Sequence, residues 1–266
     1  MRLYHATEHS FAVCAYEESP YLDMCIRSLL KQTIKSNILI ATSTPNAHIR
    51  AVADRYRIPV VVNTGKTGLA NDWNYAYHAA PGSLVTLAHQ DDVYFRNYLA
   101  NVLKALNICR HPLICFTDYQ ELKKQTVIRS SLNLSIKRTL LTPMRYSFFW
   151  KSRFVRRRIM SLGNPFCCPS ATFVKDHLGN FSFRDNMKSN IDWQAWEELS
   201  RREGEFAYVD TPCMLHRIHP GSTTTEIIGN HQRIKEDYHM LKKFWPDFLC
   251  VILETFYQYS EKSNQL

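Results

Sequence analysis

The sequence predicts an α/β protein with a mostly parallel central sheet and helices on both of its faces. Short apolar runs alternate with segments of helical periodicity through the first half of the chain. The alternation repeats at the spacing of strand-helix-strand units, which build parallel sheets. The run at 58–62 is rich in β-branched residues on both faces, as expected of a strand covered from both sides.

The expected elements follow one another in a regular order. Strands are expected at 11–15, 37–41, 58–62, 83–88 and near 113–117. Helices are expected to start at Ser19-Pro20 and at Thr44-Pro45, where a proline can occupy the first turn, and further helices at 69–80 and up to about 106.

The second half of the chain has a different pattern. Residues 119–160 are dense in Arg, Lys and aromatic side chains, so we expect an insertion, lid or docking surface outside the sheet. A helix from Asp192 to about Arg202, a strand at 205–209 and a loop through Thr225 follow. The simplest organisation is one domain over 1–225 with a helical C-terminal extension over 226–266.

The composition excludes several classes of protein. The chain of 266 residues is 45% hydrophobic and 21% charged, which excludes a disordered or collagen-like chain. No run approaches the ~18 apolar residues of a membrane-spanning helix, and the N-terminus lacks a signal-peptide pattern. Eight scattered cysteines without a C-x-x-C pair argue against a zinc ribbon or redox dithiol. We therefore expect a cytoplasmic protein.

An excess of positive charge indicates an anionic partner. Lys and Arg number 33 against 24 Asp and Glu, a net charge of +9. Much of it lies at 151–158, directly after the aromatic stretch 146–150. This segment could lie on an anionic lipid surface or could equally be a solvated helix face. A nucleic-acid-binding protein is the alternative from another class.

Polar residues follow the expected strands at one edge of the sheet, where open parallel sheets bind ligands. They are Tyr16-Glu17, Thr42-Ser43, Asn63 and the segment His89-Gln90-Asp91-Asp92. Two adjacent carboxylates after an apolar strand need compensation, and such oxygen ligands suit Mg²⁺ or Mn²⁺. The alternative is that both acids simply favour a helix N-terminus.

Two later clusters can also carry chemistry. Asp192 is either the N-cap of its helix or a general base beside Trp193. The segment from His216 to Thr225 combines two imidazoles, a guanidinium and four hydroxyls, which suits a diphosphate and metal clamp. Gly65-Lys66-Thr67 is not a phosphate loop, because Val60 occupies the position of its first glycine.

In this order the motifs resemble family 2 glycosyltransferases, the inverting enzymes of the GT-A fold, which has a Rossmann-like sheet. The similarity suggests a bacterial surface-polysaccharide type of enzyme and covers most of 11–225. It rests on the segments 11–22, 68–74, 87–94, Asp192-Trp193 and 216–219. The sequence departs from the family at Thr42-Ser43-Thr44, where an acidic residue near uracil is usual, and at His89-Gln90, Ile191 and Trp73.

The resemblance implies a metal-dependent transfer of sugar, with inversion, from a nucleotide-sugar donor, expected to be a UDP-sugar, to an acceptor hydroxyl. It implies Asp192 as general base and Mn²⁺ or Mg²⁺ held by Asp91, Asp92 and His219. It places the donor beside Tyr16, Glu17, Thr42, Asn71, Asn74, Gln90, Asp91 and Arg217. It places the acceptor beside Cys168, Ser170 and Trp193.

The expected partners follow from the same reading. The acceptor is a glycan or a lipid-linked glycan, and the basic segment would place the enzyme peripherally at the inner face of the plasma membrane. Nucleic acid is not expected, because the basic residues are confined to one segment while the carboxylates lie on the sheet edge. A metal-dependent nucleotidyltransferase is a further alternative, since it shares the sheet and the metal site.

Overall fold

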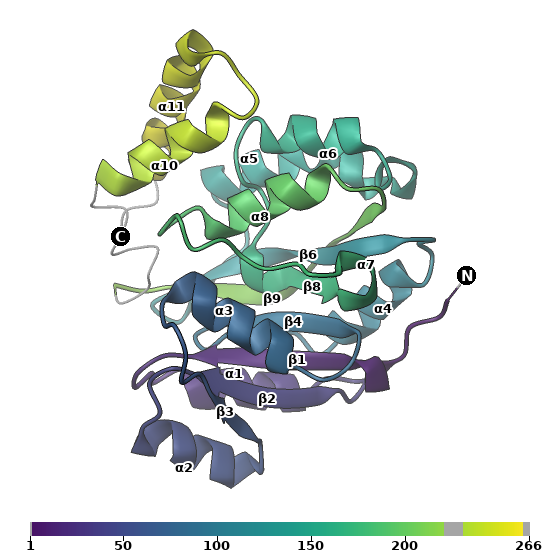
Figure 1. The fold of residues 1–266 in the computed structure, drawn as a ribbon, viewed down its shortest axis with the longest axis vertical. Helices are drawn as coiled ribbons and strands as arrows, with labels where there is room; N and C mark the ends of the chain where they lie inside the picture. The colour runs from purple at the N-terminus through teal and green to yellow at the C-terminus, as the bar shows by residue number, and fades with distance from the viewer. Residues whose placement is uncertain (1, 221–230, 263–266) are drawn as a thin grey trace.

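The computed structural model describes residues 2–220 and 231–262 (Figure 1). Its centre is a nine-stranded sheet of order β3-β2-β1-β4-β8-β6-β9-β5, with β7 paired to β6. The strands are β1 His9–Ala15, β2 Asn37–Thr42, β3 Val60–Val62, β4 Leu84–His89, β5 Val93–Tyr94, β6 Pro112–Lys123, β7 Thr126–Ile128, β8 Ala171–Val174 and β9 Glu205–Ile218. The expected α/β class is confirmed.

The sheet is mixed in direction. Strands β3, β2, β1 and β4 are parallel, as the sequence predicts for the first half. Strand β8 runs antiparallel to both of its neighbours, β4 and β6, whereas β6 and β9 are parallel to each other. The strand direction reverses from β4 to β8 and again from β8 to β6, so β6 and β9 run in the same direction as β4. The carboxyl ends of β4 and β9 therefore lie at the same edge of the sheet.

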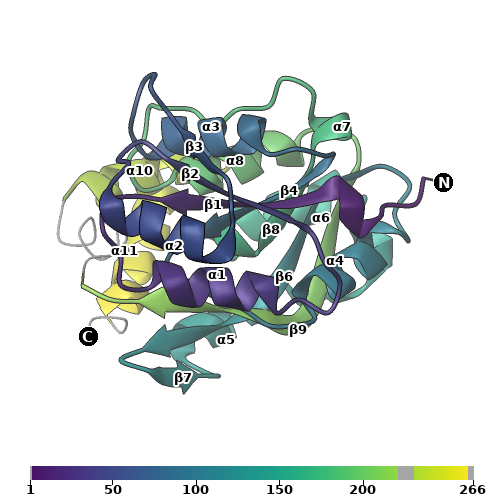
Figure 2. The same cartoon turned by 90° about the horizontal axis from the view of Figure 1, so that it is seen from below.

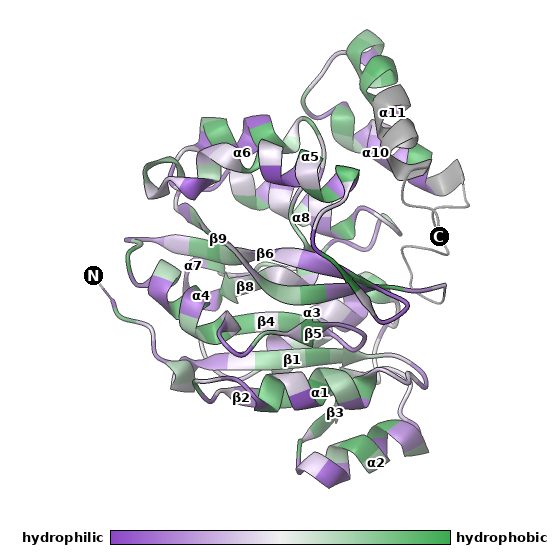
Figure 3. Ribbon diagram, turned by 180° about the vertical axis from the view of Figure 1, so that it is seen from behind, coloured by the Kyte–Doolittle hydropathy of each residue, from purple (hydrophilic) through white to green (hydrophobic). Residues whose placement is uncertain are grey.

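Helices cover both faces of the sheet (Figure 2). Helices α1 Leu22–Leu30 and α4 Tyr98–Leu106 lie on one face, and α3 Leu69–Ala79 and α8 Ile191–Ser200 lie on the other. Helix α2 Ala47–Tyr56 contacts α1 near the β3 end of the sheet. Figure 3, where hydrophobic residues are green, shows that β1 is polar at its start and apolar toward its end.

Two helices begin later than expected. The N-cap of α1 is Tyr21, because Ser19 and Pro20 form a turn in which the Leu22 N–H donates to the Ser19 carbonyl at 3.3 Å. The N-cap of α2 is Asn46, whose side chain accepts from the Ile49 N–H at 2.9 Å. Each proline therefore lies before its helix rather than in its first turn.

Part of the segment expected outside the sheet belongs to it. Strand β6 continues through Lys123 and pairs with β9 as far as Ile218. The expected insertion therefore contributes Tyr119–Lys123 and β7 to the sheet, and the expected loop at His216 is the end of a strand. The long ladder supplies hydrogen-bond partners to main-chain groups that a buried loop would leave unpaired.

Short helices form the rest of the 119–160 segment, and others precede β1 and flank β8. In the segment they are α5 Leu132–Leu140, η2 Thr142–Arg145, η3 Ser147–Phe149 and α6 Arg153–Met160. The others are η1 Ala6–Glu8 before β1, and η4 Cys168–Ser170 and α7 Lys175–Leu178 on either side of β8. Helices α10 His231–Leu241 and α11 Asp247–Lys262 lie beyond α5 and α8 (Figure 1). The expected domain boundary at 225/226 lies outside the described residues.

Among the helices that the structure describes, none combines the length and apolar character needed to cross a membrane.

Candidate active site

Acidic and imidazole groups meet in the turn after β4. The ligand atoms of His89, Asp91 and Asp92 all lie within 4.8 Å of one another. Nε2 of His89 and Oδ2 of Asp92 are buried and have no hydrogen-bond partner among the described residues. Buried polar atoms are rarely left unpaired, and one imidazole with two carboxylates is a donor set that suits a divalent cation such as Mn²⁺. The residues present therefore fit a metal ion.

Stacking on Trp73 holds His89 in this cluster. The two rings lie 5.3 Å apart between centroids and are inclined by 24°. Trp73 is buried on α3, so the indole provides a fixed wall that limits rotation of the imidazole. Trp73 and His89, two of the positions at which the sequence departs from the family, thus contact each other.

The end of β9 closes the cluster from the other side. His219 Nε2 lies 3.0 Å from Asp91 Oδ2, and His216 Nδ1 lies 3.1 Å from Asp92 Oδ1. The Arg217 N–H also donates to Asp92 Oδ1 at 2.9 Å. Burial opposes ionisation of Asp91, but its hydrogen bond with His219 and the nearby His89 and His216 leave the pKa of Asp91 below its ordinary value. Burial likewise disfavours charge on His216, but Asp92 raises its pKa overall.

Arg217 joins the carboxylate turn to the first helix. Its Nε donates to the Asp91 carbonyl at 2.8 Å, and its guanidinium lies 4.2 Å above the ring of Tyr21. The Tyr21 ring also contacts the His219 ring at 4.9 Å between centroids. The structure therefore brings the predicted residues Asp91, Asp92, Arg217 and His219 together. The hydroxyl residues at 222–225 lie outside the described part of the chain.

Four predicted donor residues lie at the ends of β1, β2 and β4 and differ in exposure. Gln90 exchanges two hydrogen bonds with the main chain of Tyr16, at 3.1 and 2.9 Å, and the Tyr16 ring is 57% exposed. Glu17 has a positive φ of 50°, and its N–H donates to the Thr44 hydroxyl at 2.6 Å. Thr42 is buried and accepts from the Thr44 N–H. Gln90 and Thr42 thus fix the loop, while Tyr16 is exposed at the surface.

Sequence reasoning did not single out Asp72 on α3. Its Oδ2 accepts from the Ser43 hydroxyl at 2.9 Å, and its Oδ1 accepts from Asn63 Nδ2 at 2.8 Å. These partners stand at the ends of β2 and β3, so Asp72 brings a carboxylate to the strand end where the sequence lacks the family's acid. The sequence signal for this carboxylate was an acidic residue in the first turn of a predicted helix, four residues after Gly68.

Asp192 is the second residue of α8, whose N-cap is Asn190, so the N-cap interpretation of Asp192 is wrong. Its Oδ2 accepts from Asn164 Nδ2 at 2.8 Å, and its Oδ1 accepts from the Trp193 N–H at 2.7 Å. Burial raises the pKa of Asp192 above its ordinary value, while these hydrogen bonds and the charges of Lys137 and Arg233 reduce the rise. A carboxylate with a raised pKa is suited to proton transfer.

The two carboxylate sites share a neighbour. Burial is the largest cause that raises the pKa of the Cys167 thiol, and the negative charges of both Asp92 and Asp192 raise it further. Lys137 of α5 influences His216 as well as Asp192. Cys167 and Lys137 therefore lie within electrostatic reach of both carboxylate sites.

Helix α10 supports the segment that precedes Asp192. The buried carboxylate of Glu236 accepts from the N–H groups of Lys188 at 2.9 Å, Ser189 at 2.8 Å and Asn190 at 3.2 Å, and from the Ser189 hydroxyl at 2.6 Å. Asn190 Nδ2 also donates to Asp237 at 2.6 Å. These partners are more than forty residues apart in sequence, so no local pattern predicts the contact.

Two predicted donor-binding residues, Asn71 and Asn74, make hydrogen bonds within the chain. Asn74 gives both ends of its amide to the main chain of Phe183, at 2.8 and 2.7 Å. Asn71 donates to the Thr67 carbonyl and to Asp185, so both asparagines tie α3 to the 183–185 loop. Donor binding by Asn71 and Asn74 stays a prediction.

The expected acceptor residues are buried. Ser170 is 0% exposed and donates to the Cys167 carbonyl, whereas Trp193 is 1% exposed and its indole N–H donates to the Met160 carbonyl. Cys168 is also buried. The polar groups of Ser170 and Trp193 are thus directed to the main chain, and their role in acceptor binding stays a prediction.

Comparison with known proteins places the chain in a family. A model of the domain described as glycosyl transferase family 2 matches residues 10–177, more than half of the chain. No curated protein matches the sequence.

Solved structures share the fold. Residues 1–349 of TarS from S. aureus, in complex with UDP-GlcNAc, align with a TM-score of 0.65 and 13% identity, over 93% of this chain and 70% of that one. The mannosyltransferase PcManGT from Pyrobaculum calidifontis, in complex with GDP-Man and Mn²⁺, aligns with a TM-score of 0.64 and 15% identity, over 90% of this chain and 64% of that one. At such identities the likeness is one of fold. With the matched domain, the GT-A sheet and the carboxylates at its edge, the chain belongs to glycosyl transferase family 2.

Proposed function

We propose that the protein is a metal-dependent inverting glycosyltransferase that moves a sugar from a UDP-sugar to a hydroxyl of a glycan or lipid-linked glycan. The observation that carries the proposal is the pair of unpaired buried atoms, His89 Nε2 and Asp92 Oδ2, beside Asp91 at the sheet edge. Relatives of the fold bind UDP-GlcNAc in one case and GDP-Man with Mn²⁺ in another, which supports a nucleotide-sugar donor and a divalent ion.

His89, Asp91 and Asp92 would hold the ion, with His219 orienting Asp91 through their hydrogen bond. When bound, Mn²⁺ or Mg²⁺ supplies positive charge that stabilises the leaving diphosphate. Arg217, fixed by the Asp91 carbonyl and the Tyr21 ring, adds a second cation for that diphosphate. The exposed ring of Tyr16 and the carboxylate of Asp72 would border the nucleoside.

Asp192 accepts the proton of the acceptor hydroxyl, whose oxygen attacks the anomeric carbon on the face opposite the diphosphate. The bond to the diphosphate breaks as the new glycosidic bond forms, so the configuration inverts in one displacement. Burial favours this role because it raises the proton affinity of the carboxylate. The natural acceptor belongs to bacterial polysaccharide synthesis in this proposal, and the enzyme works on the cytoplasmic side of the plasma membrane.

A thermal-shift panel of UDP-, GDP-, dTDP- and CDP-sugars, with and without Mn²⁺, tests the proposal, followed by detection of the released nucleotide. We expect metal-dependent stabilisation by a UDP-sugar. Asp91→Asn should weaken metal-assisted donor binding, and Asp192→Asn should abolish transfer while donor binding persists. Asp54→Asn, on the exposed surface of α2, removes the same charge as a control. Stabilisation by nucleoside triphosphates alone would instead favour a nucleotidyltransferase, and full turnover by Asp192→Asn would exclude the assigned base.

A further inference from the structure

The positive charge of the protein is concentrated in one stretch of sequence. Residues 122–175 contain 12 Lys and Arg and no Asp or Glu. The rest of the chain therefore has 33 − 12 = 21 basic residues against 24 acidic ones, a net charge of −3. The excess that gives the protein its overall charge comes entirely from the segment that contains η2, η3, α5 and α6.

The structure divides these cations into internal and external ones. Arg156 is 0% exposed and donates to the carbonyls of Ser200 at 2.9 Å and Gly204 at 2.7 Å. Arg157 pairs with the buried Glu197 at 2.8 Å. These two arginines are not available to a partner, which corrects the sequence interpretation of the whole 151–158 run as one basic surface. Arg145, Lys151, Arg153 and Arg158 are exposed.

Large aromatic side chains project among the exposed cations. Phe148 is 71% exposed and Phe154 is 72% exposed. Lys151 lies over the Phe148 ring at 5.7 Å, and Arg158 lies over the Phe154 ring at 5.7 Å. Each ring thus shares its surface position with a cation. Leaving a phenylalanine ring in water is unfavourable, and the exposed Phe154 ring adjoins an apolar groove, which indicates a partner.

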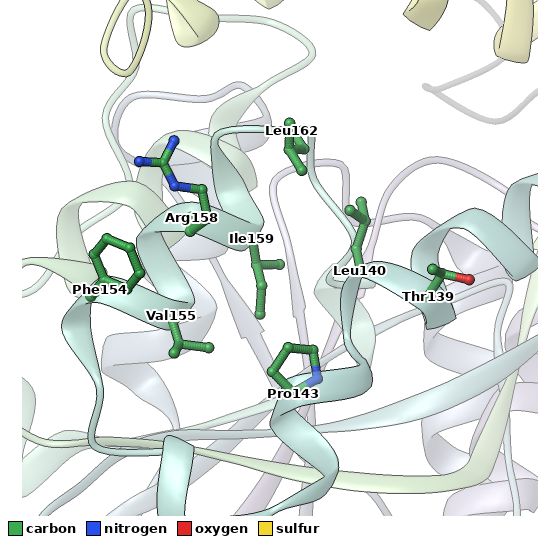
Figure 4. Close-up of a pocket in the computed structure, with 8 residues that line it drawn as sticks. All are labelled: Thr139, Leu140, Pro143, Phe154, Val155, Arg158, Ile159 and Leu162. Atoms are coloured by element: carbon green, nitrogen blue, oxygen red, sulfur yellow. The ribbon is translucent and has the colours of Figure 1, made fainter.

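Phe154 borders an apolar groove between α6 and the α5–η2 segment. The groove has a volume of about 360 Å³. Figure 4 shows Val155 and Ile159 of α6, and Leu162 just after it, directed toward Leu140 and Pro143 across the groove. Phe154 and Arg158 lie at its rim. On α5 the exposed Leu132 and Ile136 continue the row that ends at Leu140, at intervals of four residues. The apolar surface therefore extends from the groove along α5.

We propose that this surface, the α5–α6 groove with Phe148, Phe154 and their neighbouring cations, docks on an anionic lipid bilayer. Charge complementarity selects this occupant, because a row of cations attracts anionic headgroups while the aromatic rings enter the interface beneath them. An apolar groove gains nothing from a purely polar polyanion. The inference goes beyond the proposed sugar transfer. An enzyme docked in this way would meet a lipid-linked acceptor at the membrane surface.

Flotation with lipid vesicles tests the docking directly, without an activity assay. Vesicles of phosphatidylcholine are compared with vesicles containing about one-third phosphatidylglycerol, at about 50 and about 300 mM NaCl. We expect binding to the anionic vesicles at low salt and a loss at high salt. Phe148→Ser with Phe154→Ser should weaken binding about tenfold or more, and Lys151→Glu with Arg153→Glu should weaken it about fivefold for each charge lost.

Matched changes on α4 and in the turn that follows it serve as controls. Ile108 is 58% exposed, so Ile108→Ser removes a comparable apolar side chain elsewhere. Lys104→Glu with Arg110→Glu makes the same change in net charge. Both controls should retain binding, and thermal midpoints should show that every variant is folded.

Three results would overturn the docking proposal. These are absence of binding to anionic vesicles at low salt, equal losses in the control and test variants, and a monomer–dimer equilibrium that the phenylalanine changes abolish while vesicles have no effect. A failure here with metal-dependent donor stabilisation intact would refute only the membrane contact. The converse result would refute only the transfer chemistry.

Discussion

Replacing Glu236 with alanine should separate the placement of the catalytic base from donor binding. The buried carboxylate holds three consecutive N–H groups, from Lys188 to Asn190, and the Ser189 hydroxyl. Hydrogen bonds to a charged acceptor contribute about 1.5–3 kcal/mol each, but neighbouring bonds are not additive and water can enter the space. We therefore expect Glu236→Ala to lower the free energy of unfolding by about 3 kcal/mol. Glu236→Gln keeps one acceptor oxygen and should lose about 1 kcal/mol.

The effect on catalysis follows from the position of these residues. They lead directly into α8, where Asp192 is the second residue. A displacement of this segment moves the base relative to the acceptor hydroxyl, and a misplacement of about 1 Å can slow a reaction about 100-fold. Glu236 holds the segment before α8, whereas the carboxylate turn follows β4, so donor affinity should remain. We expect kcat to fall about 10- to 100-fold, with an unchanged Kd for the donor.

Steady-state kinetics, donor titration calorimetry and thermal unfolding of the same preparations would check this. Lys235→Ala is the matched control, because Lys235 is the exposed neighbour of Glu236 on α10. Glu236→Gln should recover most of the lost kcat. The reasoning would be refuted if Glu236→Ala lost stability but kept its kcat, or if donor affinity fell in parallel with turnover.

Three further predictions concern other parts of the molecule. Asp72→Ala should weaken donor binding about tenfold in calorimetry with little loss of maximal rate, because it removes the carboxylate shared by the ends of β2 and β3; unchanged affinity would remove Asp72 from the donor site. Asp192 must be ionised to act, so activity should fall as the pH drops through its raised pKa. Asn164→Ala deletes a hydrogen bond to this carboxylate, so it should move the acidic limb of the kcat profile to higher pH. A shift to lower pH would contradict the assignment. Arg156→Ala should cost about 3 kcal/mol in thermal or urea unfolding because buried carbonyls lose their donor, whereas the exposed neighbour Arg153→Ala should change stability by less than about 0.5 kcal/mol.

The sequence predicts the first half of the sheet because each strand there is a short apolar run between helical segments. It does not predict the length of β9, since Asp210, Thr211 and Pro212 are typical of a loop, and the β6–β9 ladder has register shifts near this point. The helix starts at Tyr21 and Asn46 were missed because serine or threonine before proline fits both a cap and a turn.

The site was predictable to the extent that its residues adjoin strand ends. Asp91 and Asp92 come just after β4, and Arg217 and His219 lie at the end of β9. Short sequence motifs at these two strand ends were therefore enough to predict that the residues share a site. The contacts of Asp72 and Glu236 depend on how helices pack over the sheet, which no short pattern in the sequence encodes. The burial of Ser170 and Trp193 likewise arises from tertiary packing.

The histidine in the ligand cluster bears on which ion the site would select. An imidazole in place of a third carboxylate gives the three-residue cluster one formal negative charge fewer. It also exchanges a hard oxygen donor for a borderline nitrogen donor, which weakens discrimination in favour of Mg²⁺ and improves the competition of Mn²⁺, Co²⁺ and Zn²⁺. With Trp73 stacked on that ring, metal selectivity in this chain would depend on an aromatic residue that cannot itself bind the ion.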